Sequence, residues 1–121
     1  MNLYESSEDY LERILMLELK NGKVKSIDIA HSMNFSKASV SVAMKKLKEN
    51  GYINIDEKGY ITLTDSGKEI ANNIYDRHVT LTNILVKLGV DEEIARKDAC
   101  KIEHDLSQET YDALKSFLQN K

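Results

Sequence analysis

Proline and tryptophan are absent from this 121-residue sequence, and it has a single cysteine, Cys100. Without proline, no helix has to be interrupted, so a chain dominated by long helices is expected. One cysteine excludes a framework of disulfide bonds within the chain and suits a reducing compartment. We therefore expect a cytoplasmic protein.

Long hydrophobic runs are also missing. No apolar stretch reaches the roughly 18 residues of a membrane span, and the N-terminus has no basic segment followed by an apolar one. A membrane is therefore not an expected partner. The sequence also has no glycine-rich phosphate loop and no arrangement of a nucleophile beside a general base. We expect neither an enzyme nor a small-molecule substrate.

Charge is unevenly distributed along the chain. The net charge is −3, yet residues 20–48 contain seven lysines against one acidic residue, Asp28, which gives this segment a charge of +6. The acidic residues are concentrated from Asp91 to Asp112. Such asymmetry is typical of a protein that binds a polyanion on one face. The alternative is a lysine-rich face that is merely solvated.

Two short helices with a tight turn between them are expected over residues 26–50. Ser26 and Ser36 are the expected N-caps, and Val40, Met44 and Leu47 repeat at helical spacing in the second helix. This pattern is typical of a helix-turn-helix, whose second helix enters the major groove of DNA; a helical hairpin in a bundle is the alternative. The expected DNA-binding residues in this region are Lys25, Ser26, Ser36, Lys37, Ala38, Ser39, Val42, Lys45 and Lys46.

A β-hairpin is expected directly after the second helix. Residues 52–55 and 60–63 alternate apolar and polar side chains around a glycine-containing turn. A hairpin in this position is the wing of a winged helix, and Lys58 at its tip is expected to contact a phosphate. The sequence therefore predicts a mainly α fold with a small β-hairpin, in which residues 1–64 form an N-terminal winged helix-turn-helix DNA-binding domain.

Residues 65–121 are expected to form a helical domain. A long linking helix over about 65–88 has an apolar stripe that includes His78, and a second helix follows the Asp91 cap with Ala95, Ala99, Ile102 and Leu106 buried. A last helix runs from Ser107 to about Leu118. These helices have more apolar surface than a small winged helix needs, so we expect them to form a homodimer interface.

A group of metal-ligating side chains lies within this second region. If residues 98–104 are helical, then Cys100, Glu103 and His104 project from one face and offer a mixed sulfur, oxygen and nitrogen ligand set. His78, Asp9 and Glu12 are further candidates for the same site. Each has an alternative: a core hydrogen bond for His78, a capping box with Ser6 for Asp9, and a solvent-facing side chain for Glu12.

Five stretches of the chain resemble the diphtheria-toxin-repressor family, in particular its short manganese-repressor-like branch without an SH3-like domain. They are residues 8–12, 28–30, 36–47, 77–78 and 98–107, and they occur in the family's order. The resemblance implies a dimeric, metal-activated transcription regulator that represses metal-uptake genes by binding pseudo-palindromic, double-stranded operator DNA. It also implies metal ligands at Asp9, Glu12, His78, Cys100, Glu103 and His104.

The sequence also departs from the family. Thr82 and Lys97 stand where an ancillary metal site has a glutamate and a histidine, so that site cannot form as such. Cys100 replaces a bridging glutamate of the manganese branch, and Asp9 replaces a methionine of the iron branch. A thiolate favours Fe(II), or Zn(II) or Ni(II) in vitro, whereas Asp9 and Glu12 suit Mn(II). We expect one tight site for Fe(II) or Mn(II), with a weaker second one at Glu12 and His78.

Two other functions fit parts of the same pattern. The first is a metal-independent winged-helix regulator in which Cys100 is a redox sensor or is simply packed. The second is a small metalloenzyme that uses the same ligands with an open coordination position. Replacement of Cys100 or His104 tests the first alternative, and a screen for hydrolase turnover tests the second.

Overall fold

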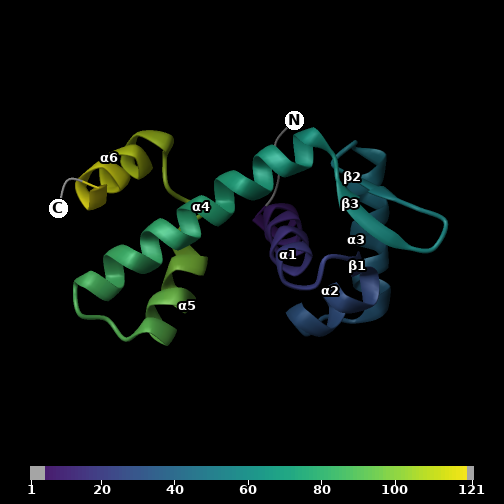
Figure 1. The fold of residues 1–121 in the computed structure, drawn as a ribbon, viewed down its shortest axis with the longest axis horizontal. Helices are drawn as coiled ribbons and strands as arrows, with labels where there is room; N and C mark the ends of the chain where they lie inside the picture. The colour runs from purple at the N-terminus through teal and green to yellow at the C-terminus, as the bar shows by residue number, and fades with distance from the viewer. Residues whose placement is uncertain (1–4, 120–121) are drawn as a thin grey trace. The chain divides into compact units, whose positions relative to one another are not determined.

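The computed structural model of the chain describes residues 5–119, which form six helices and three short strands (Figure 1). The order is α1 (Glu5–Asn21), β1 (Val24–Lys25), α2 (Ser26–Met33), α3 (Lys37–Glu49), β2 (Ile53–Ile55), β3 (Tyr60–Leu63), α4 (Asp65–Lys87), α5 (Glu92–Ile102) and α6 (Gln108–Gln119). The predicted mainly α fold with a small β-hairpin is confirmed. None of the helices in the described part of the chain could cross a membrane.

The chain divides into two compact units, residues Met1–Asn72 and Asn73–Lys121. The division falls inside helix α4, which begins in the first unit and continues into the second. The predicted domain boundary after residue 64 stays a prediction.

Helix α1 contributes an apolar stripe to the interior of the first unit. Leu11 and Ile14 have no exposed surface, and Leu15 is buried beside them. The prediction that Ser6 caps this helix is wrong, because α1 already includes Glu5 and Ser6 lies within it.

Helices α2 and α3 form the predicted helix-turn-helix. Asn34 ends α2 in the left-handed conformation with φ of 59°, and Ser36 caps α3 by accepting a hydrogen bond from the Ser39 amide at 3.1 Å. The expected cap of α2 is wrong, because Ser26 is its first helical residue. Lys25 is the N-cap residue, and the Asp28 carboxylate accepts a hydrogen bond from the Lys25 amide at 2.9 Å.

The predicted hairpin is also confirmed, and the sheet has one strand more than expected. Strands β2 and β3 pair antiparallel with Ile53 opposite Leu63, and β1 adds to the other side of β3 with Val24 opposite Ile61. The hairpin turn is closed by Asp56, whose Oδ1 accepts from the amides of Lys58 and Tyr60 at 2.9 Å each. A two-residue strand carries too little alternation to be predicted from the sequence.

The start of helix α4 is fixed against the end of the helix-turn-helix. The Thr64 hydroxyl donates to the Gly51 carbonyl at 2.7 Å and accepts from the Gly67 amide at 3.2 Å, so Thr64 is the N-cap of α4. Gly67 is required at this point, because a Cβ atom there would lie 2.0 Å from the Tyr52 carbonyl oxygen. Both contacts lie within the first unit.

The second unit departs from the prediction at the end of α5. The helix ends at Ile102, and residues 103 to 105 form a turn before α6. Ile102 is 40% exposed, whereas Glu103 is completely buried and continues the buried positions of Ala95 and Ala99. The expected burial of Ile102 is therefore wrong, and the charged residue occupies the interior. Helix α6 begins as expected after Ser107, whose hydroxyl oxygen accepts from the Thr110 amide at 3.1 Å.

Candidate metal centre and nucleic-acid interface

His78 and Glu103 form a buried polar pair in the second unit. The Nδ1 atom of His78 on α4 lies 3.0 Å from Oε1 of Glu103 in the turn after α5. The His78 side chain is 18% exposed and that of Glu103 is 0% exposed. A glutamate is almost never fully buried unless it is paired, so this carboxyl group marks a site that the fold maintains.

The second carboxyl oxygen of Glu103 is also enclosed. Within residues 5–119, Glu103 Oε2 is buried and no hydrogen-bond donor reaches it. A buried acceptor without a partner costs about 1–3 kcal/mol. A bound cation would remove that cost. The 3.0 Å separation of Nδ1 and Oε1 is also that of neighbouring ligand atoms in an octahedral site with bonds of about 2.1 Å.

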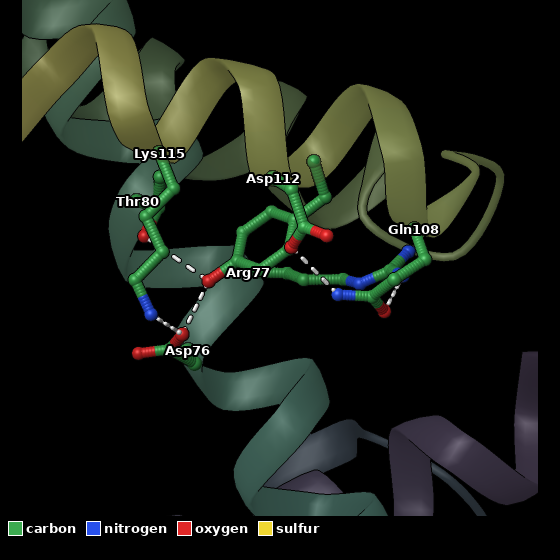
Figure 2. A network of polar contacts seen from close by, with 7 residues as sticks. Asp76, Arg77, Thr80, Gln108, Asp112 and Lys115 are labelled. Atoms are coloured by element: carbon green, nitrogen blue, oxygen red, sulfur yellow. Dashed lines mark hydrogen bonds and ion pairs between the residues drawn. The ribbon is translucent and has the colours of Figure 1, made fainter.

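Arg77 holds the turn that carries Glu103. Its Nη1 donates to the carbonyl oxygens of Glu103 at 3.1 Å and Leu106 at 2.7 Å, and its Nη2 donates to Oε1 of Gln108 at 3.1 Å. Figure 2 shows Arg77 reaching from α4 toward Gln108, whose amide in turn donates to Asp112 at 2.9 Å. Arg77 is 7% exposed, so these contacts form in the interior or at its edge.

A second polar group joins α4 to α6 beside Arg77 (Figure 2). The hydroxyl of Tyr111 donates to Asp76, and Lys115 Nζ lies 2.9 Å from the same carboxylate oxygen. The hydrogen bond from Tyr111, followed by that from Lys115, lowers the pKa of Asp76. Burial, and then the bond to Asp76, raises the pKa of Tyr111. This group fixes α6 without touching Glu103.

The sequence did not predict a role for Arg77 or Tyr111. A signal for Arg77 was present: it lies three residues after Ile74 and four before Leu81, both of which are buried. An arginine at such spacing belongs to the interior-facing side of an amphipathic helix. Its partners could not be predicted, because two of them are backbone carbonyls of a turn that was expected to be helix.

The other predicted ligands occupy different surroundings. Glu103 is the C-cap of α5, with helical dihedral angles and its amide bonded to the Ala99 carbonyl, so the shared face of Cys100, Glu103 and His104 stays a prediction. Cys100 is exposed on α5, and His104 is half-buried in the turn. In the first unit, Glu12 is buried on α1 and Asp9 is half-buried. The expected solvent-facing alternative for Glu12 is therefore wrong.

The two positions of the family's ancillary site offer no carboxylate or imidazole. Thr82 is buried and its hydroxyl donates to the His78 backbone carbonyl at 2.7 Å, whereas Lys97 is exposed. Thr82 thus supports the helix at His78 and is not an open ligand position. The absence of an ancillary site of that kind stays a prediction.

Helix α3 presents a continuous exposed face in the first unit. Val40, Met44 and Leu47 are buried, and the residues between them are exposed except for the half-buried Ala43. Val42 is 57% exposed, which leaves it available for contact with a base. The predicted DNA-binding residues that are exposed on this helix or its cap are Ser36, Lys37, Ala38, Ser39, Val42, Lys45 and Lys46.

The remaining predicted DNA-binding residues lie at the sheet and its turn. Lys58 is exposed in the hairpin turn, whereas Lys25 and Ser26 are half-buried at the start of α2. The ammonium groups of Lys25 and Lys23 each lie 4.8 Å from the centre of the Tyr60 ring. Lys25 is therefore positioned by an aromatic ring on β3. Its contact with DNA, like those of the other residues, stays a prediction.

Two family models match the chain. Residues 2–61 match the N-terminal DNA-binding domain of the iron-dependent repressors, and residues 64–121 match their metal-binding and dimerisation domain. The predicted winged helix-turn-helix followed by a helical dimerisation domain is thereby confirmed.

Two similar proteins are described as transcriptional regulators. An uncharacterized HTH-type transcriptional regulator of Methanocaldococcus jannaschii is 42% identical over 117 residues, which is 95% of this chain and 94% of the relative. The transcriptional regulator MntR of Salmonella typhimurium is 36% identical over 115 residues, covering 95% of this chain and 73% of the relative.

Solved structures share the fold. A manganese-dependent transcriptional repressor in complex with manganese has a TM-score of 0.86 and 29% identity, covering 93% of this chain and 52% of its own. IdeR of T. acidophilum has a TM-score of 0.84 and 28% identity, covering 98% of this chain and 55% of its own. The chain spans about half the length of these structures.

Proposed function

Since the chain belongs to the iron-dependent repressor family of metal-dependent DNA-binding transcription regulators, we propose that it is a homodimeric repressor whose affinity for double-stranded operator DNA rises when Fe(II) or Mn(II) binds at His78 and Glu103. The observation that carries this proposal is the buried pair itself. One carboxyl oxygen lies 3.0 Å from the imidazole, and the other has no donor among the described residues. We propose that the protein acts in the cytoplasm and that it is not an enzyme.

The ligand set proposed for the ion combines residues of both units. His78 and Glu103 come from the second unit, and the buried Glu12, with Asp9, comes from α1 of the first. Each offers a nitrogen or a carboxyl oxygen, and such ligands suit Mn(II) and Fe(II). Cys100 and His104 are proposed as further ligands, with Cys100 favouring the softer metals; Zn(II) and Ni(II) are expected to bind in vitro.

Coupling to DNA follows from where these ligands are placed in the chain. A bound ion supplies positive charge that neutralises the carboxylates and joins them to the imidazole. Glu12 and Asp9 lie on α1, in the DNA-binding domain, whereas His78 and Glu103 lie in the dimerisation domain. Fixing one to the other would set the spacing of the two recognition helices of a dimer near one DNA turn, about 34 Å, or a multiple of it.

The test is DNA affinity with and without metal. A duplex selected from a random library on the Mn(II)-loaded protein would be labelled, and its binding measured by fluorescence anisotropy with Mn(II), with anaerobic Fe(II) and with chelator. A coupling of about 1–3 kcal/mol predicts 5- to 150-fold tighter binding with metal. Equal affinities in all three conditions would contradict the proposal and support the alternative, a metal-independent winged-helix regulator.

Two lysine variants sharpen the DNA part of the proposal. Lys45→Ala removes a proposed phosphate contact from α3 and should weaken binding to every duplex, with the slope of log affinity against log salt reduced by about 1. Lys87→Ala removes a lysine that is also exposed, at the C-terminal end of α4, and should leave the slope unchanged. Equal salt slopes in the two variants would show that Lys45 on α3 makes no phosphate contact with the DNA.

A further inference from the structure

The backbone and the side chain of Glu103 are held by neighbouring residues of one helix. His78 contacts the carboxyl group, and Arg77, the preceding residue of α4, donates to the carbonyl oxygen. The same Nη1 also donates to the Leu106 carbonyl. These two carbonyls lie beyond the end of α5, where helical amide partners are no longer available.

The shape of arginine matters for this arrangement. A guanidinium presents donors in a rigid planar fork, so one side chain can bind two carbonyls and a side-chain amide at once, whereas a lysine presents a single point charge. Arg77 uses Nη1 for the two carbonyls and Nη2 for Gln108, the first residue of α6. It thereby spans the whole connection from α5 to α6.

We propose that Arg77 is a positioning residue of the metal centre, which holds the 103–106 turn so that the Glu103 carboxyl group faces the ion. Arg77 is itself a cation and no metal ligand, so it acts through Glu103. This inference rests on the proposed function, because it assigns a role in the same site. Supporting residues of this kind typically change metal affinity by 10- to 100-fold when they are replaced.

The neighbouring Tyr111 group supplies the matched control. The Tyr111 ring lies 5.2 Å from the guanidinium carbon of Arg77, and its hydroxyl donates to Asp76. Tyr111→Phe removes a buried link between α4 and α6 and keeps the ring and all three Arg77 hydrogen bonds. A role of Arg77 that is only structural would make the two substitutions equivalent for metal binding at equal loss of stability.

The experiment measures Mn(II) affinity and stability of the apo-protein in parallel. The full chain would be titrated with Mn(II), with free ion followed by electron paramagnetic resonance, and the Tm of each metal-free variant recorded by circular dichroism. Arg77→Met should weaken Mn(II) binding by about 10- to 100-fold and Arg77→Lys by less. The Mn(II) affinity of Tyr111→Phe should stay within about twofold of that of the original chain, even if its metal-free Tm falls as far as that of Arg77→Met.

The outcomes separate this inference from the function on which it rests. Absence of Mn(II) binding by the unsubstituted chain would overturn both. Tight binding by that chain and equally tight binding by both Arg77 variants would overturn the positioning role alone. An affinity loss in Tyr111→Phe as large as that in Arg77→Met would also overturn it. If Arg77→Met does not fold, Arg77→Lys decides, since it keeps the charge and loses only the fork.

Discussion

The two units of the chain fill their interiors with different chemistry. In the first unit the buried residues are apolar, apart from Glu12 on α1. In the second unit the buried residues of the described chain include Arg77, Thr80, Thr82 and Glu103. Two buried atoms there, Arg77 Nε and Glu103 Oε2, have no hydrogen-bond partner among residues 5–119.

This difference indicates which unit responds to a ligand. An apolar interior is stabilised by removal of hydrocarbon from water, and that contribution is the same whether or not a metal is present. A polar interior is stable only when its groups are paired, so a cation that pairs the last carboxyl oxygen adds stability where the interior lacks it. The polar interior of the second unit should therefore gain stability from metal, whereas the apolar interior of the first unit, apart from Glu12, should not.

The largest effect is expected from the apolar interior. Met44 on α3 is 1% exposed, so Met44→Ala should lower the free energy of unfolding by about 2–5 kcal/mol through lost burial and the cavity left behind. The increment in stability that Mn(II) adds should be unchanged. Urea denaturation with and without Mn(II) measures both quantities. A smaller Mn(II) increment in Met44→Ala would contradict the division between the units.

An intermediate effect is expected at the polar interior. At a Mn(II) concentration of 100 times Kd the original chain should gain about 2.7 kcal/mol, and Glu103→Gln should lose most of that gain. Its metal-free stability should stay equal or rise, because an ionisable carboxyl group in the interior is replaced by a neutral amide. The control is Glu92→Gln, an exposed glutamate of the same unit paired with Arg96, which should keep the gain. A full gain in Glu103→Gln would show that this residue is no ligand.

The smallest effect is expected from the half-exposed ion pair of Asp76 and Lys115. Because the bonds from Tyr111 and Lys115 lower the pKa of Asp76, the stability that it adds is present above its unfolded pKa, about 3.9. This stability is lost as the pH falls through the lower folded pKa. Metal-free Asp76→Asn should therefore have a lower Tm than the original chain at pH 6, and the difference should shrink toward pH 3. A difference independent of pH would contradict the assignment.

Much of the first unit could be predicted from local sequence. Ser36, the spacing of Val40, Met44 and Leu47, and the alternation on either side of the hairpin turn each depend on neighbours within a few residues. The errors there concern single caps: Ser26 was the expected cap of α2, but it is the first helical residue, and Asp28 binds the Lys25 amide. Strand β1 was missed because its partner β3 lies far away in the sequence.

The second unit was predicted less well, for a reason visible at the end of α5. Helical periodicity continues past Ile102 in the sequence, so residues 98–104 were expected to form one helical face. The structure ends the helix at Ile102, and Arg77 and His78, 25 or more residues earlier, bind the backbone and the side chain of Glu103 just beyond it. A long-range polar contact of this kind leaves no periodic signal.

By itself, the sequence determined that the chain is mainly helical and that a winged helix-turn-helix precedes a helical domain. It also determined which residue types are available to a metal. These properties depend on local propensity and on the periodic placement of apolar side chains, which short segments already contain. Only the tertiary structure decided that Glu103 is interior, that Cys100 is exposed, and that Arg77 spans the turn. Burial and hydrogen-bond partners depend on what the rest of the fold brings near each group, and no single segment contains that information.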